Sequence, residues 1–216
     1  MAKKGVLIAI EGIDGSGKTT QSEMLFNSLR LLSLPAILLH EPTTGYYGRI
    51  IREKLAKEHI NPEEAYFLFV MDRREHVRQK ILPALKDGKI VIIDRYFIST
   101  IAYQGAGGIS IERIISDHRT FAPIPDLIII LDISIDTALR RLKAKRNRDM
   151  FEKNKDFLER VRNIYLRIKN LLSTKVIVIN AEKDPKEIHI EILKHVCRLL
   201  KERGFLEDDE ICLRKR

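Results

Sequence analysis

Five short apolar runs alternate with longer segments of mixed polarity along the chain. The runs lie at residues 5–12, 36–42, 89–94, 126–134 and 175–181. Runs this continuous are typical of strands that are buried on both faces of a sheet. Because helical patterns separate the runs, the strands are expected to be parallel and joined by right-handed crossovers. The pattern predicts an α/β fold, in which a five-stranded parallel sheet carries helices on both faces.

The segments between these runs contain readable helix ends. Asn61 is followed by proline and two acids, which predicts a helix over residues 62–85, and Gly88 follows its end. Asp184 opens the last long helix in the same way. Between residues 156 and 172, apolar side chains recur at the spacing of one helix face. This stripe is expected to face the core.

The length and composition are those of one domain. The 216 residues contain no repeat, low-complexity segment or linker, so residues 1–204 are predicted to form a single domain and residues 205–216 a loose tail. No apolar run reaches the ~18 residues needed to cross a bilayer. Cys197 and Cys212 lack the spacing of a metal site and suggest no disulfide framework, which fits a cytoplasmic protein.

The formal net charge of +9 leaves several interpretations open. A basic protein can bind nucleic acid or small polyphosphates, or can carry a lysine-rich solvated surface. No recognised nucleic-acid-binding module is visible in the sequence. Nucleic acid is therefore not an expected partner.

Residues 12–19, GIDGSGKT, join the first predicted strand to a helical segment. This glycine-rich pattern in this context is typical of a loop whose backbone N–H groups surround the phosphates of a nucleotide. The N-terminus of the following helix adds partial positive charge. Lys18 is expected to bridge the β- and γ-phosphates of a nucleoside triphosphate, and Thr19 to bind Mg²⁺. The residues predicted to surround this nucleotide are Gly12, Ile13, Asp14, Gly15, Ser16, Gly17, Lys18 and Thr19.

Asp94 and Arg95 stand at the end of the third predicted strand. Open parallel sheets bind ligands beyond the carboxyl ends of their strands. An aspartate there suits a Mg²⁺ site, with the metal held directly or through water. The arginine offers a bidentate fork for a second phosphate. A structural ion pair at a strand end is the alternative interpretation.

Phe69 and Arg73 lie four residues apart in the predicted helix, and therefore on one face. A ring and a guanidinium so placed can stack on a base and hold a monophosphate, although a core Phe beside a surface Arg gives the same spacing. Ser99, Tyr103 and Gln104 follow in the segment after Arg95. Tyrosine and glutamine can read a base edge or pack on a sugar.

Together these motifs resemble the thymidylate kinases of the nucleoside-monophosphate kinase group. Residues 11–21, EGIDGSGKTTQ, resemble the phosphate loop of that family, and residues 68–77, LFVMDRREHV, resemble its acceptor-site helix. Residues 93–108, IDRYFISTIAYQGAGG, resemble its most specific signature. The resemblance covers nearly the whole chain. It implies a P-loop kinase architecture with a mobile lid at about 143–153, Mg²⁺-dependent transfer from ATP to dTMP, and a homodimer.

The resemblance also implies roles at the acceptor site. Asp14 would contact the 3′-hydroxyl of the sugar, and Phe69 would stack on thymine. Arg73 and Arg95 would hold the acceptor phosphate. Tyr103 would crowd the 2′ position and so favour a deoxyribose. The residues implied to surround dTMP are Asp14, Glu41, Pro42, Phe69, Arg73, Arg95, Ser99, Tyr103 and Gln104.

The chain departs from the family pattern in two loops. The family usually has Arg-Glu-Pro-Gly-Gly after its second strand, whereas residues 40–45 here read HEPTTG, so the loop beyond Pro42 is expected to differ in shape. The family lid often shows Asp-Arg-x-Glu, whereas residues 149–152 here read DMFE. One lid arginine is therefore absent from its usual place.

The position of the catalytic cations separates two branches of the family. One branch has an arginine in the phosphate loop, where this chain has Gly15, and the other carries its cations in the lid. Residues 140–149, RRLKAKRNRD, are rich in cations, so the chain resembles the lid-cation branch. The candidate catalytic cations are Lys18, Arg95, Lys145, Arg146 and Arg148, and Arg140 is a candidate ATP contact.

Two other functions stay open at this point. A kinase for another nucleoside or deoxynucleoside monophosphate, such as dUMP, would share most of these motifs. A non-enzymatic nucleotide-binding switch would share the phosphate loop. The chain lacks the Asn-Lys-x-Asp motif of guanine recognition, which argues against a GTPase switch.

Overall fold

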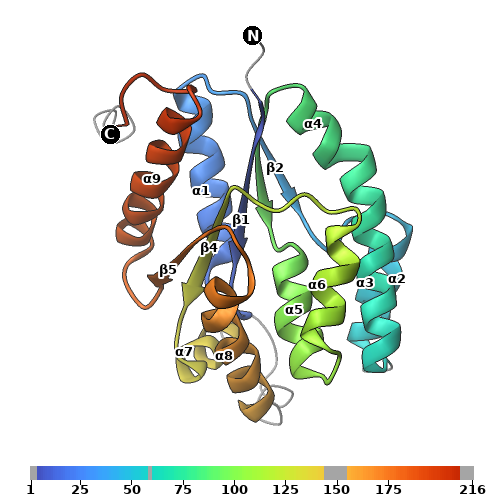
Figure 1. Ribbon diagram of the computed structural model, residues 1–216. Coiled ribbons are helices and arrows are strands. Elements are labelled where there is room, and N and C mark those ends of the chain that lie inside the picture. The colour runs from blue at the N-terminus through green and yellow to red at the C-terminus, as the bar shows by residue number, and fades with distance from the viewer. Residues whose placement is uncertain (1–3, 58–59, 144–154, 210–216) are drawn as a thin grey trace.

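The structure, a computed structural model, describes residues 4–57, 60–143 and 155–209. Within these residues, five parallel strands form one sheet in the order β2-β3-β1-β4-β5 (Figure 1). The strands are β1 (Val6–Glu11), β2 (Ala36–His40), β3 (Ile90–Asp94), β4 (Leu127–Asp132) and β5 (Lys175–Asn180). Each strand lies within an apolar run that predicted it. The predicted α/β fold with a five-stranded parallel sheet is confirmed.

Helices cover both faces of this sheet, as the sequence pattern predicts. α1 and α9 pack together on one face, whereas α4, α5 and α8 lie on the other (Figure 1). The helical elements of the described residues are α1 (Lys18–Leu31), α2 (Tyr46–Ala56), α3 (Pro62–His76), η1 (Val77–Ile81), α4 (Leu82–Lys86), α5 (Phe97–Ala106), α6 (Ile111–Arg119), α7 (Ile135–Lys143), α8 (Lys155–Leu171) and α9 (Pro185–Glu202).

The central strand, β1, pairs with β3 on one side and with β4 on the other. All of its residues are buried, because helices cover both faces of the sheet. The register places Ile10 beside Asp94 on β3, and His40 at the end of β2 beside the same aspartate. The carboxyl ends of β1, β2 and β3 therefore meet at one edge, where an open parallel sheet binds its ligands.

The helix predicted over 62–85 is present, but it is not uniform. The Asn61 side chain accepts a hydrogen bond from the backbone N–H of Glu64, at 2.9 Å, as expected of a cap. α3 then passes into η1, a π-helical turn, before α4. Pro83 offers a reason, because its ring would clash with the carbonyl of Gln79 and it has no N–H to donate. A wider turn accommodates such a residue.

The two C-terminal helices follow the predictions made from their ends and their periodicity. Asp184 caps α9 by accepting a hydrogen bond from the N–H of Lys186, at 2.8 Å. α8 buries Val161 and Tyr165 as part of its apolar stripe. The predicted tail is not wholly loose, because Phe205 and Leu206 pack against the core. Residues 210–216 lie outside the described residues.

Three further predictions meet the structure here. Cys197 lies buried on α9 and is disulfide-bonded. This corrects the expectation of no disulfide, which rested on cysteine spacing, because spacing in the sequence does not fix distance in space.

The lid predicted at 143–153 lies, apart from Lys143, outside the described residues. None of the helices in the described ranges is long and apolar enough to cross a membrane.

Candidate active site

The loop between β1 and α1 turns tightly, and its conformation requires glycine. Gly12 and Gly15 have positive φ angles of 141° and 82°. A Cβ atom at Gly12 would lie 2.5 Å from the carbonyl oxygen of Leu131, and one at Gly15 would lie 2.8 Å from that of Ala138. Both the backbone angle and the available space therefore exclude larger residues at these positions.

Lys18 is a buried cation at the start of α1. Its Nζ donates a hydrogen bond to the carbonyl oxygen of Ile13, at 2.8 Å, so the side chain folds back over the loop. Burial, together with the positive charge of Arg95, lowers the pKa of Lys18 to about 8. The phosphates of a nucleotide would add negative charge beside this buried ammonium, and would raise its pKa again.

Thr19 and Asp94, the two residues predicted to hold a metal, lie together. Thr19 Oγ1 donates a 2.6 Å hydrogen bond to Asp94 Oδ2. Asp94 Oδ1 is buried and has no hydrogen-bond partner among the described residues. These hard oxygen atoms fit Mg²⁺, which commonly takes one or two protein ligands and completes its shell with phosphates and water. The described residues contain no cluster of three His, Cys, Asp or Glu that could hold a metal alone.

A pocket of about 800 Å³ opens beside the phosphate loop. Thr19 and Asp94 contribute to its wall, so the pocket reaches the predicted metal site. Every residue that the resemblance places around dTMP also lines it. These residues are Asp14, Glu41, Pro42, Phe69, Arg73, Arg95, Ser99, Tyr103 and Gln104.

Asp14, Arg95 and Tyr103 form one polar cluster at this pocket. The Arg95 Nη2 forms an ion pair with Asp14 Oδ1. The Tyr103 hydroxyl donates to Asp14 Oδ2 and accepts from the Asp14 backbone N–H, each at 3.1 Å. The Arg95 guanidinium holds the pKa of Asp14 below its usual range. The cluster ties the phosphate loop to α5 and to the residue that follows β3.

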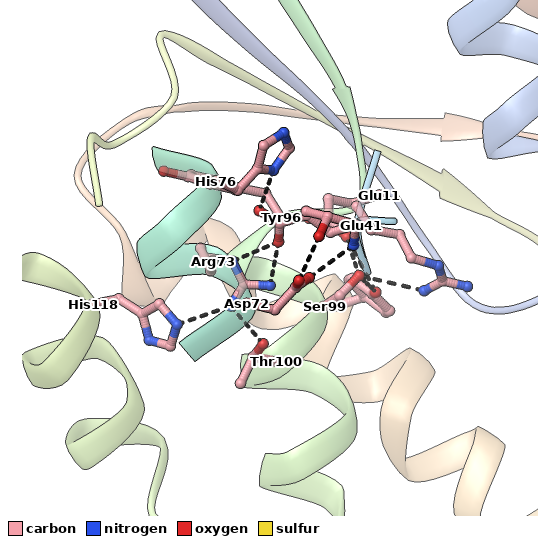
Figure 2. Close-up of polar contacts among 12 residues, drawn as sticks. Glu11, Glu41, Asp72, Arg73, His76, Tyr96, Ser99, Thr100 and His118 are labelled. Carbon is pink, nitrogen blue, oxygen red and sulfur yellow. Dashed lines mark hydrogen bonds and ion pairs between the residues drawn. The ribbon is translucent and has the colours of Figure 1, made fainter. Parts of the chain in front are cut away.

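Arg73 has a different environment from Arg95, although the sequence predicts the same role for both. Its side chain is 1% exposed, against 20% for Arg95. Glu41 Oε2 accepts from Arg73 Nε at 2.7 Å and from Nη2 at 2.6 Å, and Thr100 Oγ1 accepts from Nη1 at 2.9 Å (Figure 2). The charge of Arg73 is therefore balanced inside the protein.

The loop after β2 has its own anchor on α3. Asp72 accepts hydrogen bonds from the Thr43 backbone N–H at 2.8 Å and from the Thr43 hydroxyl at 2.5 Å. A Cβ atom at Gly48 would lie 1.9 Å from the carbonyl oxygen of Thr43, so α2 approaches the loop closely. These contacts fix the course of the chain just beyond Pro42.

Sequence reasoning missed several polar residues of this region. Glu11 is fully buried at the end of β1 and accepts hydrogen bonds from the Tyr96 backbone N–H, at 2.7 Å, and from the Ser99 hydroxyl, at 2.6 Å. Burial raises the pKa of Glu11 to about 7. A carboxyl at the end of an otherwise apolar strand was a visible signal. Thr100 and Arg52 also line the pocket, and no sequence pattern marked them.

Arg140 and Arg141 are neighbours on α7, but their side chains have different contacts, which the sequence does not reveal. Arg140, the predicted ATP contact, is exposed and donates to Thr137 Oγ1 at 3.0 Å. Arg141 instead lies against the phosphate loop and donates to the carbonyl oxygen of Gly15 at 3.3 Å. The contact of Arg140 with ATP stays a prediction. The candidate lid cations Lys145, Arg146 and Arg148 lie outside the described residues.

Comparison with known proteins gives a consistent result. A family model described as thymidylate kinase matches residues 10–192. The chain is 43% identical to a thymidylate kinase from Brachyspira hyodysenteriae, over 89% of this chain and 94% of that protein. It is 39% identical to a probable thymidylate kinase from Pyrococcus abyssi, over 88% of this chain and 95% of that protein. A thymidylate kinase from Desulfotalea psychrophila is 45% identical, over 69% and 75%.

Proposed function

The chain belongs to the thymidylate kinase family, and we propose that it transfers the γ-phosphoryl group of ATP to the phosphate of dTMP, giving ADP and dTDP. The observation that supports this most directly is the shared pocket. Phe69, Arg95 and Tyr103 line the same cavity as Thr19 of the phosphate loop. An acceptor nucleotide in this cavity has its phosphate next to the γ-phosphate of a bound ATP.

Positioning and charge neutralisation carry the proposed reaction. The acceptor phosphate is itself the nucleophile, so the chain does not need to supply a general base. Lys18 binds the transferring phosphoryl group from the phosphate loop. Arg95 binds the acceptor phosphate and aligns it for in-line attack. Thr19 and Asp94 are the residues that would hold Mg²⁺, and the bound metal would supply neutralisation of phosphate charge.

The acceptor end of the pocket selects the nucleotide. Phe69 stacks on the thymine ring, and Ser99 and Gln104 lie along the base. Tyr103 crowds the 2′ position, while Asp14 contacts the 3′-hydroxyl. Of the two arginines, Arg95 is the better candidate for the main phosphate ligand, because its side chain is 20% exposed whereas that of Arg73 is 1% exposed.

We place the chain in the lid-cation branch of the family. Gly15 occupies the position at which the other branch carries an arginine. Its positive φ and the nearby carbonyl of Ala138 leave no room for a side chain in this conformation. Another cation must therefore reach the transferring phosphoryl group, and the candidates are Lys145, Arg146 and Arg148. Arg141, which contacts the same loop, is a further candidate.

A homodimer and a cytoplasmic location complete the proposal. On α2 and α3, Tyr46, Leu55 and Phe67 are 62%, 47% and 57% exposed, which leaves apolar surface that a second copy could cover. Phe67→Glu should then weaken self-association, as measured by sedimentation at several protein concentrations. A parent chain that stays monomeric at every concentration would contradict the dimer. The cytoplasmic location stays a prediction, and the disulfide at Cys197 removes the cysteine pattern on which it rested.

Transfer of label tests the proposed function. The purified chain is mixed with dTMP, Mg²⁺ and ATP labelled in its γ-phosphate, and the products are separated. The proposal expects the label in dTDP. Label that stays in ATP, or that appears only as inorganic phosphate, would point to a nucleotide-binding switch or a nucleotide hydrolase instead.

A further inference from the structure

The hydrogen atoms of Arg73 can be accounted for almost completely. A guanidinium has five N–H groups. Glu41 Oε2 accepts from Nε and from Nη2, at 2.7 and 2.6 Å. Thr100 Oγ1 and His118 Nε2 each lie 2.9 Å from Nη1 (Figure 2). One N–H of Nη2 is then left without a partner among the described residues. Because Arg73 lines the pocket, this N–H is what it can offer to an acceptor nucleotide.

The tautomer of His118 follows from its two contacts. Its Nδ1 lies 2.7 Å from the carbonyl oxygen of Ile114, which can only accept, so Nδ1 carries the hydrogen. Nε2 then has a lone pair and accepts from Nη1 of Arg73. Burial, with the positive charge of Arg73 as the next cause, lowers the pKa of His118 to about 3. The imidazole is therefore neutral, which is the only form that can accept this hydrogen bond.

Aromatic packing holds the imidazole ring in place. The ring of His118 is 1% exposed and stacks on Phe97, with centroids 5.4 Å apart and an angle of 22° between the planes. The ring of Phe121 packs on another side of the imidazole, with ring centroids 5.4 Å apart. A ring held in this way cannot turn its Nε2 away from Arg73 without disturbing the core. The contact thus holds one side of Arg73, which lines the pocket, from behind the pocket wall.

We propose that His118 is a positioning residue for the acceptor site, which fixes the Nη1 side of Arg73 so that the remaining N–H of Nη2 stays available to the acceptor nucleotide. The proposal rests on the proposed function. The proposed role differs from that of a histidine that only fills the core. A core-filling role depends on ring volume, whereas this role depends on an acceptor atom at the position of Nε2.

Two substitutions test the hydrogen bonds of the two ring nitrogens of His118 separately. His118→Gln can place an acceptor oxygen near the position of Nε2, and His118→Asn can replace only the Nδ1 hydrogen bond to the carbonyl of Ile114. We expect His118→Asn to raise the dTMP KM by about tenfold, because it removes a hydrogen bond to a charged group. We expect His118→Gln to stay within about threefold of the parent, and both variants to keep the parent's ATP KM.

Controls separate positioning from loss of stability. Ile192→Val removes one buried methyl group from α9, away from the pocket lining, and should leave both KM values unchanged while lowering the Tm. If His118→Asn keeps the parent's dTMP KM, or if His118→Gln is impaired as strongly as His118→Asn, the proposal is wrong. A parent chain that does not phosphorylate dTMP at all would overturn the proposed function itself, and this proposal with it.

A measurement on the unaltered chain covers the case in which the variants do not fold. Long-range ¹H–¹⁵N NMR correlations report which nitrogen of a histidine ring carries the hydrogen. The proposal expects His118 to be the Nδ1–H tautomer, with an Nε2 resonance that moves when dTMP is added. An Nε2–H tautomer, or an Nε2 resonance that does not move when dTMP is added, would overturn the proposal.

Discussion

Arg95 and Asp14 form an ion pair that joins the end of β3 to the phosphate loop. The side chains are 20% and 52% exposed, so both can be reached from the pocket. The pair places the guanidinium of Arg95 between the donor and acceptor sites, and the carboxylate of Asp14 balances its positive charge. An acceptor phosphate that enters the pocket can share the guanidinium, and the 3′-hydroxyl of its sugar can reach Asp14.

The first prediction concerns Arg95. Arg95→Ala should raise the dTMP KM by about tenfold to a hundredfold, because hydrogen bonds to a charged group are removed. The ATP KM should change little. Arg95→Lys is the matched control, which keeps the charge but loses the planar fork, and it should recover only part of the affinity. Steady-state kinetics with each substrate varied in turn measures both constants, and an unchanged dTMP KM in Arg95→Ala would remove Arg95 from the acceptor site.

The second prediction concerns Lys18. Lys18→Ala should lower kcat by about a hundredfold or more, because a preorganised charge on the transferring phosphoryl group is lost. The fold should survive, as circular dichroism and the Tm would show. Lys57→Ala, at an exposed position just after α2, is the control and should retain the parent rate. Near-normal turnover of folded Lys18→Ala would contradict the phosphate-loop assignment.

The fold follows closely from the sequence because its signals are local and repeated. An apolar run such as 127–132 is typical of a strand covered on both faces, and the caps at Asn61 and Asp184 mark where two helices begin. The π-helical turn at η1 could not be predicted. A proline within a helix can be accommodated in several ways, and tertiary packing selects among them.

The family resemblance named nine residues around dTMP, and all nine line one pocket, although their contacts with dTMP stay predictions. The contacts among these residues could not be predicted. Motif spacing could not show that Arg73 is balanced by Glu41, which lies 32 residues away in the chain. The same applies to His118, whose role depends on a contact made only after α6 folds against α3. Buried partners of this kind are fixed by tertiary structure.

The third prediction concerns pH and Glu11. Burial raises the pKa of Glu11 to about 7, from 4.5 in its ordinary state. The folded chain therefore holds this proton more tightly than the unfolded chain, and the free energy of unfolding should fall as pH rises from about 4.5 to about 7. The shift corresponds to about 3 kcal/mol. Glu11→Gln cannot titrate and should lose this part of the slope.

Denaturant unfolding of the parent and of Glu11→Gln at pH 5 and pH 8 measures this difference. The comparison between the two chains cancels the titration of groups that they share. Equal pH slopes for the parent and for Glu11→Gln would show that this carboxyl is ionised at pH 5, and that its contacts with Ser99 and Tyr96 stabilise the charge.

The fourth prediction concerns the cation that Gly15 cannot supply. Arg146→Ala or Arg148→Ala should lower kcat by at least about tenfold, with little change in the dTMP KM, because an arginine on a transferring phosphoryl group contributes strongly to the rate. The combined alanine variant of Lys145, Arg146 and Arg148 gives the clearest test. Turnover at the parent rate under saturating ATP and dTMP would exclude these three residues, and Arg141 would be the next candidate.

The central claim is that the pocket beside the phosphate loop is built for dTMP. Its most direct test is a competition, in which equal concentrations of dTMP, dUMP, CMP and GMP share one reaction with limiting ATP and Mg²⁺, and the diphosphates are quantified at early times. The account predicts that dTDP forms fastest, with dUDP behind it by a modest factor, because a missing methyl group changes binding by only about 1–3 kcal/mol. Faster formation of GDP or CDP would contradict it.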